Sequence, residues 1–418
     1  MNIEIPYGKE AVSVSINEMC EVLYPRKITI KNEKKIIKAA LENPLHTISF
    51  DEFAKKSEKL LVIVNDATRP TPTSKILEYL YPILSLHPQV AFLVATGVHR
   101  PPTDEEYEYI FGKYYTTFKN HIIAHDARNE KDVVYLGKSK NGTEMYINKL
   151  VPEYGNVLVI GSVEPHYFAG YTGGRKSFLP GVASYKTIQM NHKLALSDKA
   201  KSLALSGNPV HEDMVDAMNV LNDINVFSIQ TILTADHKIY AATAGDLHKS
   251  FDAAIEYANQ IFCVPLSQKG NIVVTAAPYP MDVDLYQSQK ALDNGKLALE
   301  EDGVIILVSK CRTGVGEEAF LDLLGSASCC KDVLNKIADE YKLGYHKAAK
   351  MAQIGITAEM WAVSDLDSSV IKKAQMKPYS DIQIAVDDAI KKIKDKSRTP
   401  KIVVMPYGSL TIPLLKGS

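Results

Sequence analysis

The stretch Leu60-Leu-Val-Ile-Val-Asn-Asp-Ala-Thr-Arg-Pro-Thr-Pro-Thr-Ser-Lys-Ile-Leu-Glu-Tyr-Leu-Tyr-Pro-Ile-Leu84 predicts in turn a strand, a polar turn and a helix. Its first residues form a continuous apolar run rich in branched side chains, which is typical of a parallel strand buried on both faces. From Thr73 onward apolar residues return at helical spacing, and Pro72 stands where a helix start tolerates a missing backbone N–H. The stretch therefore predicts one β–α unit of an α/β fold.

Short apolar runs of the same kind recur along the chain, and each ends in a polar or glycine-rich turn. They occupy residues 89–97, 156–161, 271–276 and 303–308. Amphipathic stretches such as Ser288–Leu299 lie between them, and this alternation is typical of an α/β protein with largely parallel sheets. The beginning of the chain differs. Residues 2–7 and 11–16 alternate with period two around Gly8, which predicts a β-hairpin.

The chain is long enough for two domains, because 418 residues exceed the size at which one hydrophobic core keeps growing. A linker near Pro265–Gly270 precedes a new strand, so we predict an N-terminal α/β domain at residues 1–266 and a C-terminal α/β domain at residues 267–418. Residues 330–400 are expected to be largely helical, and the last strand can return to the first domain. We expect an active-site cleft between the domains, since ligands of open α/β folds bind beyond the carboxyl ends of strands.

The composition argues against several classes of function. The formal net charge is -1 and 23% of the residues are charged, so nothing indicates a nucleic-acid partner. The first residues lack the pattern of a secretion signal, and no apolar run approaches the roughly 18 residues of a membrane helix. The five cysteines are scattered, so we expect reduced thiols in a cytoplasmic protein rather than a zinc site.

The turn Asp66-Ala67-Thr68-Arg69 lies between the first strand and its helix. Helix N-termini attract anions, and Arg69 can add a bidentate contact to a carboxylate or a phosphate. The alternative is a capped turn with a surface salt bridge.

Two histidines, His99 and His166, stand shortly after strands and near prolines. Histidine titrates near neutral pH, so the pair can act as acid and base on opposite faces of a substrate. The alternative is that one or both cap a helix or bond a buried carbonyl.

The segment Gly170-Tyr-Thr-Gly-Gly-Arg-Lys176 matches neither common nucleotide-binding motif. Its glycine pair permits a ligand to approach the backbone, and Arg175 can lower the pKa of the Lys176 amine and make it a better nucleophile. The alternative is an exposed basic turn. His192 follows on an expected helix without a second histidine or cysteine one turn away, so it can hold a metal only if a cofactor supplies the other ligands.

Tyr286, Gln287 and Lys290 open the first helix after the linker. Tyr286 and Lys290 are four residues apart and share a helix face, so Lys290 can attract an anionic substrate. The alternative is a solvated helix lysine. Trp361, the only tryptophan, is expected to lie in the core.

Together these motifs resemble the nickel-pincer lactate racemase family, the nickel-dependent 2-hydroxyacid racemases. The matching segments, in the expected order, are Asp66-Ala-Thr-Arg-Pro-Thr-Pro72, Ala95-Thr-Gly-Val-His-Arg-Pro101, Glu164-Pro-His166 through Gly-Gly-Arg-Lys176, Met190-Asn-His192 and Tyr286-Gln-Ser-Gln-Lys290. The resemblance implies a cofactor, the nickel-pincer nucleotide (pyridinium-3-thioamide-5-thiocarboxylic acid mononucleotide). It would be attached to Lys176 through a thioamide, with His192 as the protein's ligand to nickel.

The resemblance also implies roles for the remaining positions. His99 and His166 correspond to the acid/base pair, and the segment from Asp66 to Arg69 to a region that contacts cofactor or substrate. Gln287 and Lys290, beside Tyr286, correspond to residues that hold the substrate carboxylate. Separate cofactor-synthesis proteins would be needed for maturation.

The implied reaction is racemisation of a small 2-hydroxyacid, most simply lactate. Removing a proton from C2 of the carboxylate would build a costly dianion, whereas removing a hydride while a histidine takes the hydroxyl proton gives a ketoacid. Return of the hydride to the other face then inverts the centre. The alternatives are a racemase or epimerase of another 2-hydroxyacid and a non-catalytic organic-anion binding or regulatory protein. An ordinary metal hydrolase would need ligands that the sequence does not supply.

Overall fold

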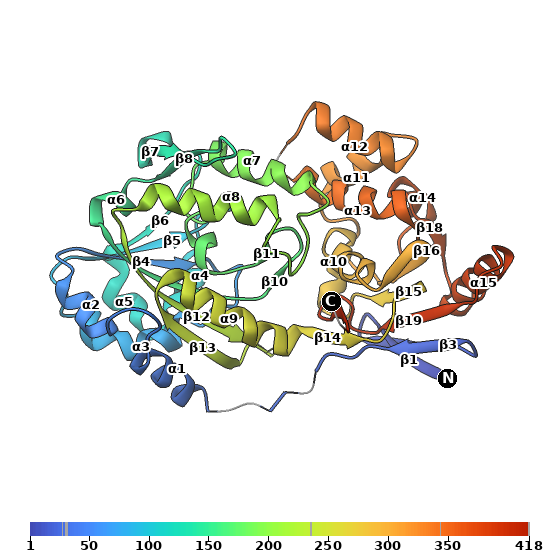
Figure 1. The fold of residues 1–418 in the computed structure, drawn as a ribbon, viewed down its shortest axis with the longest axis horizontal. Coiled ribbons are helices and arrows are strands. Elements are labelled where there is room, and N and C mark those ends of the chain that lie inside the picture. Colours follow the sequence, from blue (N-terminus) through green and yellow to red (C-terminus); the bar gives the residue numbers. More distant parts are fainter. Residues whose placement is uncertain (27, 30–31, 235, 343, 417–418) are drawn as a thin grey trace. The chain divides into compact units, whose positions relative to one another are not determined.

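The structure is a computed structural model of the chain and describes all residues except 27, 30–31, 235, 343 and 417–418. The described residues form two compact units, which can be followed by colour in Figure 1. We call Ile28–Ile261 the first unit, and Met1–Lys27 with Phe262–Ser418 the second unit. Each is built around a sheet of mainly parallel strands, which confirms the predicted α/β class.

The sheet of the first unit has the strand order β13-β12-β9-β4-β5-β6. All neighbours run parallel except β12 and β13. The strands are β4 (Leu60–Asn65), β5 (Val90–Ala95), β6 (Ile122–Ala124), β9 (Asn156–Ser162), β12 (Asn225–Leu233) and β13 (Ile239–Gly245). Because β9, β4 and β5 are parallel neighbours, the polar segments that follow them emerge at one edge of the sheet.

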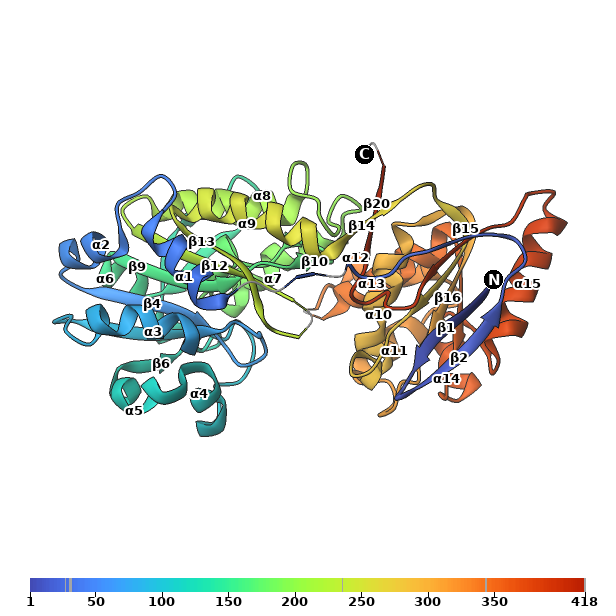
Figure 2. The same ribbon diagram turned by 90° about the horizontal axis from the view of Figure 1, so that it is seen from below.

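Helices cover both faces of this sheet, and Figure 2 shows α3 on one side and α8 and α9 on the other. The helices of the first unit are α1 (Glu33–Glu42), α2 (Phe50–Lys56), α3 (Thr73–Leu84), α4 (Asp104–Phe111), α5 (Tyr115–Phe118), α6 (Leu150–Tyr154), α7 (Tyr185–Lys193), α8 (Pro209–Met218) and α9 (Leu247–Phe262). The short ribbons β7 (Val133–Lys138) with β8 (Glu144–Asn148), and β10 (Pro165–His166) with β11 (Gly170–Tyr171), lie outside the main sheet.

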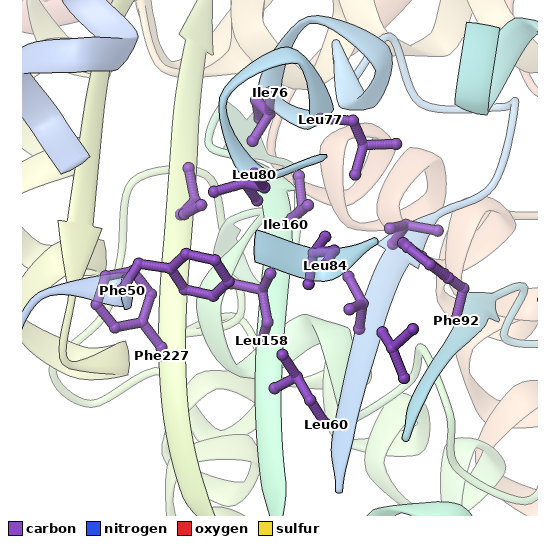
Figure 3. Packing of buried hydrophobic residues seen from close by; sticks show 14 of the residues in the cluster. Phe50, Leu60, Ile76, Leu77, Leu80, Leu84, Phe92, Leu158, Ile160 and Phe227 are labelled. Carbon is purple, nitrogen blue, oxygen red and sulfur yellow. The ribbon is translucent and has the colours of Figure 1, made fainter. Parts of the chain in front are cut away.

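The buried run of β4 explains the fold of this unit. Leu60 and Val62 pack into the cluster that includes Leu77 and Leu80 of α3 (Figure 3). Leu61 and Ile63 alternate with them, face the other side of the sheet and are equally buried. Each such side chain contributes roughly 1.5–3 kcal/mol when it leaves water, so a polar residue anywhere in the run would be costly.

The sheet of the second unit has the order β18-β17-β16-β15-β19-β3, and all its neighbours are parallel. Its strands are β3 (Met19–Val22), β15 (Gly270–Ala276), β16 (Leu299–Val308), β17 (Glu359–Val363), β18 (Lys377–Tyr379) and β19 (Lys401–Met405), and β14 (Cys263–Leu266) pairs with β20 (Ile412–Leu415) apart from it. The helices are α10 (Leu285–Lys296), α11 (Glu318–Gly325), α12 (Cys330–Asp339), α13 (Tyr345–Thr357), α14 (Ser368–Lys373) and α15 (Ile382–Asp395). The region 330–400 thus contains two strands besides its helices. Trp361 lies in one of them and is buried in the core, as expected.

The division of the chain differs from the sequence prediction at the N-terminus. The break at Ile261 is close to the expected residue 266, but residues 1–27 belong to the second unit. The predicted hairpin forms from β1 (Asn2–Tyr7) and β2 (Glu10–Ser15), and its apolar face is buried in the core of the second unit. The period-two pattern predicts a hairpin without identifying the core that covers it. The strand expected last in the sequence, at Lys401–Met405, forms β19 and likewise pairs within the second unit, between β15 and β3.

All five cysteines are free thiols, as expected. None of the helices in the described part of the chain has the length and apolar character needed to span a bilayer.

Candidate active site

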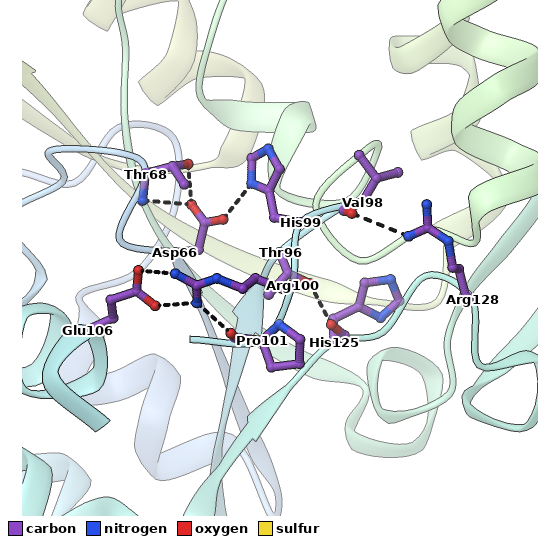
Figure 4. A network of polar contacts seen from close by, with 10 residues as sticks. All are labelled: Asp66, Thr68, Thr96, Val98, His99, Arg100, Pro101, Glu106, His125 and Arg128. Atoms are coloured by element: carbon purple, nitrogen blue, oxygen red, sulfur yellow. Dashed lines mark hydrogen bonds and ion pairs between the residues drawn. The ribbon is translucent and has the colours of Figure 1, made fainter. Parts of the chain in front are cut away.

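His99 is held by a carboxylate at the edge of the first unit's sheet. Its Nδ1 lies 2.7 Å from Oδ2 of Asp66, and Figure 4 shows the imidazole directed at this carboxylate. A carboxylate only accepts hydrogen bonds, so Nδ1 carries the proton and Nε2 presents a lone pair. The imidazole side chain is 50% exposed, whereas the Asp66 side chain is only 7% exposed. The arrangement orients His99 as a proton acceptor at Nε2.

The turn after β4 fixes the Asp66 carboxylate. Both the backbone N–H and the hydroxyl of Thr68 donate to Oδ1 of Asp66, at 3.2 and 2.6 Å. One oxygen therefore closes the turn, and the other is left for His99. The capped turn, which was the alternative interpretation of this segment, is therefore present, and its carboxylate also positions His99.

His166 is held in the opposite tautomer. It lies in the β10–β11 ribbon, and its Nδ1 accepts the backbone N–H of Ala169 at 3.3 Å. A neutral ring in this position carries its proton on Nε2. Burial holds the pKa of His166 well below its ordinary value, and the positive charges of Lys176 and Arg69 lower it further. His166 thus presents an N–H where His99 presents a lone pair.

The glycine-rich segment folds as a tight turn that leads into Lys176. Gly173 and Gly174 both have positive φ, at 78° and 53°. A Cβ on Gly173 would stand 2.6 Å from Oε1 of Gln230, the same oxygen that accepts the N–H of Gly174 at 3.2 Å. The glycine pair is therefore required for the turn itself, and the turn places Lys176 in a short helical segment at Gly174–Ser177.

The surroundings of Lys176 favour the neutral form of its amine. Burial lowers the pKa of Lys176 well below its ordinary value, and Arg69 and then Arg175 lower it further. The sequence prediction that Arg175 lowers this pKa has the right direction, but burial is the larger cause and Arg69 the larger charge. An unprotonated amine is the nucleophilic form, so Lys176 is suited to a covalent attachment.

Arg175 itself is a structural cation. It is 2% exposed, and its Nη2 donates to the carbonyl of Ala169 at 2.7 Å, while its guanidinium lies 4.4 Å from the ring centre of Phe251. Burial lowers the pKa of Arg175 to about 9. By bonding the Ala169 carbonyl it fixes the segment whose N–H holds His166.

Phe168 is a residue that the sequence did not single out, and it brings three of the predicted residues together. Its ring centre lies 4.5 Å from that of His166, 5.1 Å from that of His192 and 5.4 Å from the Nζ of Lys176. The phenyl ring thus forms one wall shared by both histidines and the lysine. In the sequence, only its position two residues after His166 could have indicated that Phe168 lies in the site.

His192 lies on α7 as predicted and is 8% exposed. The preceding Asn191 donates to Oδ2 of Asp213 at 2.8 Å, and this buried carboxylate also accepts from Ser139 and Thr143 at 2.5 and 2.8 Å. Asp213, on α8, therefore ties α7 to the loop between β7 and β8. No sequence pattern indicated this role.

Arg69 forms an ion pair with Glu164, in which Nη1 lies 3.4 Å from Oε1. Both side chains are about one-third exposed, and surface pairs of this kind contribute at most about 1 kcal/mol. Little free energy is therefore needed for Arg69 to leave Glu164 and bind another anion. Its charge lowers the pKa values of both Lys176 and His166, which places it beside them.

In the second unit, Tyr286, Gln287 and Lys290 lie in the first turns of α10, as predicted. Asp284 caps this helix by accepting the N–H of Gln287 at 2.6 Å. Lys347 of α13 donates to the carbonyl of Tyr286 at 2.6 Å, and its Nζ lies 3.6 Å from the ring centre of that tyrosine. The sequence had not indicated Lys347.

The stability of the second unit should depend on pH through Lys347. Burial, and then the charge of Lys290, lower the pKa of Lys347 to about 7. The unfolded chain keeps this proton up to about pH 10.4, so the free energy of unfolding should rise with pH between about 7 and 10. At pH 6.5 we expect Lys347→Met to raise the free energy of unfolding by about 1–4 kcal/mol, because it removes a buried charge.

The gain in Lys347→Met should vanish by pH 10, where the wild-type amine is already neutral and the variant still lacks the bond to the Tyr286 carbonyl. Urea unfolding at pH 6.5, 8 and 10 measures this difference. An advantage that is the same at all three pH values would show that packing, and not charge, is responsible.

No three histidine, cysteine, aspartate or glutamate side chains in the described part of the chain are grouped so that they alone could hold a metal ion. His192, the predicted metal ligand, could therefore hold a metal only together with donors from a bound group.

Comparisons with known proteins identify the family of the chain. Residues 7–203 match the family model of the lactate racemase N-terminal domain, and residues 266–412 match that of the lactate racemase C-terminal domain. The lactate racemase of Thermoanaerobacterium thermosaccharolyticum is 32% identical over 422 residues, covering 97% of this chain and 98% of the relative. The lactate racemase of Lactiplantibacillus plantarum is 30% identical over 423 residues, with the same coverage.

Two solved structures share the fold. The lactate racemase apoprotein from T. thermosaccharolyticum has a TM-score of 0.88 at 31% identity and covers 99% of this chain and 100% of its own. A protein from Thermotoga maritima has a TM-score of 0.65 at 16% identity and covers 92% and 98%, which shows a shared fold alone. Both family models and the near-complete coverage show that the chain belongs to the lactate racemase family.

Proposed function

We propose that this racemase-family enzyme interconverts the enantiomers of a small 2-hydroxyacid with the help of a nickel-pincer nucleotide attached to Lys176. The observation that carries the proposal is the grouping of Lys176, His192 and His166 around Phe168. A neutral nucleophilic amine, a buried metal donor and a histidine that carries its proton on Nε2 serve different chemical purposes. The proposed reaction uses all of them.

The residues present fit such a cofactor. Burial lowers the pKa of Lys176 and so favours the neutral amine, which is the form able to form an amide-type bond. The donor set offers one imidazole, His192, which fits a metal that receives its other donors from the cofactor. When bound, this cofactor supplies a site that takes a hydride from C2 and returns it.

The protein's own residues would manage the proton. His99, with its lone pair at Nε2, takes the hydroxyl proton of one enantiomer, and His166 directs its Nε2–H at the substrate oxygen. For the other enantiomer the two roles are exchanged, so that His166 takes the hydroxyl proton and His99 donates a hydrogen bond to the substrate oxygen.

The substrate carboxylate would be held by Arg69, Gln287 and Lys290, with Tyr286 beside them. Lactate has about six non-hydrogen atoms, so its binding free energy is limited to about 9 kcal/mol. Charge-assisted hydrogen bonds of roughly 1.5–3 kcal/mol each, from Arg69 and Lys290, would be a large share of that. Lactate is the simplest substrate that satisfies these requirements.

The test is to co-express the chain with cofactor-synthesis proteins and to measure intact mass, nickel content and racemisation together. We expect a mononucleotide-sized adduct that maps to the peptide containing Lys176, one nickel per chain, and formation of the opposite enantiomer from a pure 2-hydroxyacid. A protein that stays unmodified and inactive beside a family enzyme that is loaded by the same machinery would contradict the proposal. It would instead favour a protein that binds organic anions without turnover.

A further inference from the structure

His166 is oriented by a single peptide group, the one that joins Phe168 to Ala169. The N–H of this group donates to Nδ1 of His166 at 3.3 Å. The group lies in the turn between β10 and β11, where the ladder ends with the pair His166 and Gly170. The pairing of the two strands therefore does not fix this peptide group, and the tautomer of His166 depends on whatever else holds it.

The side chain of Asn208 holds the other end of the same peptide group. Its Nδ2 donates to the carbonyl of Phe168 at 2.8 Å and to that of Ala204 at 2.9 Å. Its Oδ1 accepts the N–H groups of Val210 and His211 at the start of α8, at 3.1 and 3.4 Å. Because two carbonyls lie on one side of the amide and two N–H groups on the other, only one orientation of the amide satisfies all four.

The turn that carries Asn208 is packed directly against the β10–β11 ribbon. The N–H of Leu203 donates to the carbonyl of Gly170 at 3.2 Å. A Cβ on Gly170 would stand 2.3 Å from the carbonyl oxygen of Ala204, so only glycine allows the two segments to come this close. Asn208 itself is 0% exposed. Its amide is therefore a fixed point from which the ribbon can be oriented.

The two hydrogen bonds act on opposite ends of one peptide group, so each strengthens the other by polarising the amide. Rotation of the peptide plane by half a turn would point the Phe168 carbonyl at Nδ1 of His166. A hydrogen bond there would require a proton on Nδ1, and Nε2 would then present a lone pair. The same rotation would break the bond from Asn208 and remove the acceptor of a buried N–H, which is costly.

We propose that Asn208 is a positioning residue, which keeps the proton of His166 on Nε2 by fixing the Phe168–Ala169 peptide group. The effect on the tautomer is a property of the chain alone. The effect on turnover rests on the proposed function, in which His166 directs this N–H at the substrate oxygen. Thr68 has the corresponding part at the other histidine, where it fixes the carboxylate that orients His99.

Asn208→Ser separates this role from the capping of α8. Serine is about as good a helix N-cap as asparagine, but it has no amide N–H₂ for the Phe168 carbonyl. Nitrogen NMR of the full-length, cofactor-free chain labelled with ¹⁵N-histidine measures the tautomer, and His166→Gln identifies the resonances. We expect the wild type to be protonated on Nε2, and the Nδ1–H form to reach at least about a tenth of the molecules in Asn208→Ser, since one hydrogen bond changes an equilibrium by roughly tenfold.

Kinetics of the cofactor-loaded enzyme give the second readout. Expressed per loaded site, kcat of Asn208→Ser should fall by roughly 10- to 100-fold while KM changes by less than about threefold, because substrate binding does not depend on the His166 tautomer. Asn271→Ser is the matched control. Asn271 is 2% exposed at the amino end of β15, donates to the Thr399 carbonyl at 2.8 Å and accepts the N–H of Lys401 at 2.9 Å. It should lose comparable stability and leave kcat and the tautomer unchanged.

A His166 ring that stays protonated on Nε2 in Asn208→Ser, with kcat no lower than in Asn271→Ser, would overturn the inference and leave the proposed function intact. A changed tautomer in a protein that is never loaded and never racemises would support the positioning role and remove the proposed function. If Asn208→Ser does not fold, Asn208→Asp measured at pH 8 keeps the cap and turns an oxygen toward the Phe168 carbonyl. It should change the tautomer in the same direction, and an unchanged tautomer would contradict the role of Asn208.

Discussion

Lys176→Ala should give a folded protein that carries no covalent cofactor and has no measurable racemase activity. Burial and the charge of Arg69 lower the pKa of Lys176 and favour its neutral, nucleophilic form, whereas alanine has no atom to which a cofactor could be attached. Lys176→Arg should fail equally, because a guanidinium stays protonated and is a poor nucleophile. We expect both the racemase activity and the covalent adduct to be lost completely, which is the largest effect that we predict for any substitution in this chain.

Intact mass spectrometry and a chiral assay on the same preparation measure both quantities. Lys186→Ala is a matched control, since Lys186 is a solvent-exposed lysine of α7 that pairs with Glu144. The control should be loaded and active like the wild type. Activity in Lys176→Ala after co-expression with the synthesis proteins would show that the cofactor is not attached through this residue.

Asp66→Asn should reduce kcat by about 10²–10⁴-fold while leaving the fold intact, because it reverses the tautomer of His99. Both hydrogen bonds from Thr68 go to Oδ1 of Asp66, so the amide oxygen of the asparagine must take that position. Its amide N–H₂ then faces His99 and donates to Nδ1. The ring proton moves to Nε2, and the lone pair that accepts the substrate proton is lost.

Steady-state kinetics in both directions measure this effect, and because the equilibrium constant of a racemisation is one, kcat/KM must fall equally from either enantiomer. Asp126→Asn is the control, because Asp126 also closes a turn through its side chain, by accepting the N–H of Arg128 at 2.9 Å, and is exposed. The double variant Asp66→Asn with His99→Ala should be no slower than His99→Ala alone. Full additivity of the two losses, or a kcat of Asp66→Asn within about threefold of the wild type, would refute the role of this pair.

Much of the fold follows from local patterns along the chain. The run at residues 60–64 predicts a doubly buried parallel strand because its side chains are apolar on both faces, and β4 is such a strand. The helix after Pro72 and the hairpin around Gly8 were predicted for equally local reasons. The strand containing Trp361 was missed because only Met360–Val363 are apolar, and a run this short between helices does not distinguish strand from helix.

Residues that act through distant partners could not be predicted in this way. The packing of residues 1–27 on the second unit depends on pairs such as β3 with β19, which are far apart in the sequence. The motifs led to His99, His166, Lys176 and His192, but Phe168 and Lys347 gain their roles only from what the fold places beside them. A phenylalanine or a helix lysine has no local signature for such a role.

The most direct test of the central claim follows the hydrogen at C2. Enantiopure lactate labelled with deuterium at C2 is incubated with the cofactor-loaded enzyme in ordinary water, and the label is measured in the enantiomer that forms. The account predicts that deuterium remains at C2, because it moves as a hydride that does not exchange with water while His99 and His166 handle only the hydroxyl proton. Loss of the label to solvent at the rate of racemisation would mean that C2 is deprotonated, and it would contradict the account.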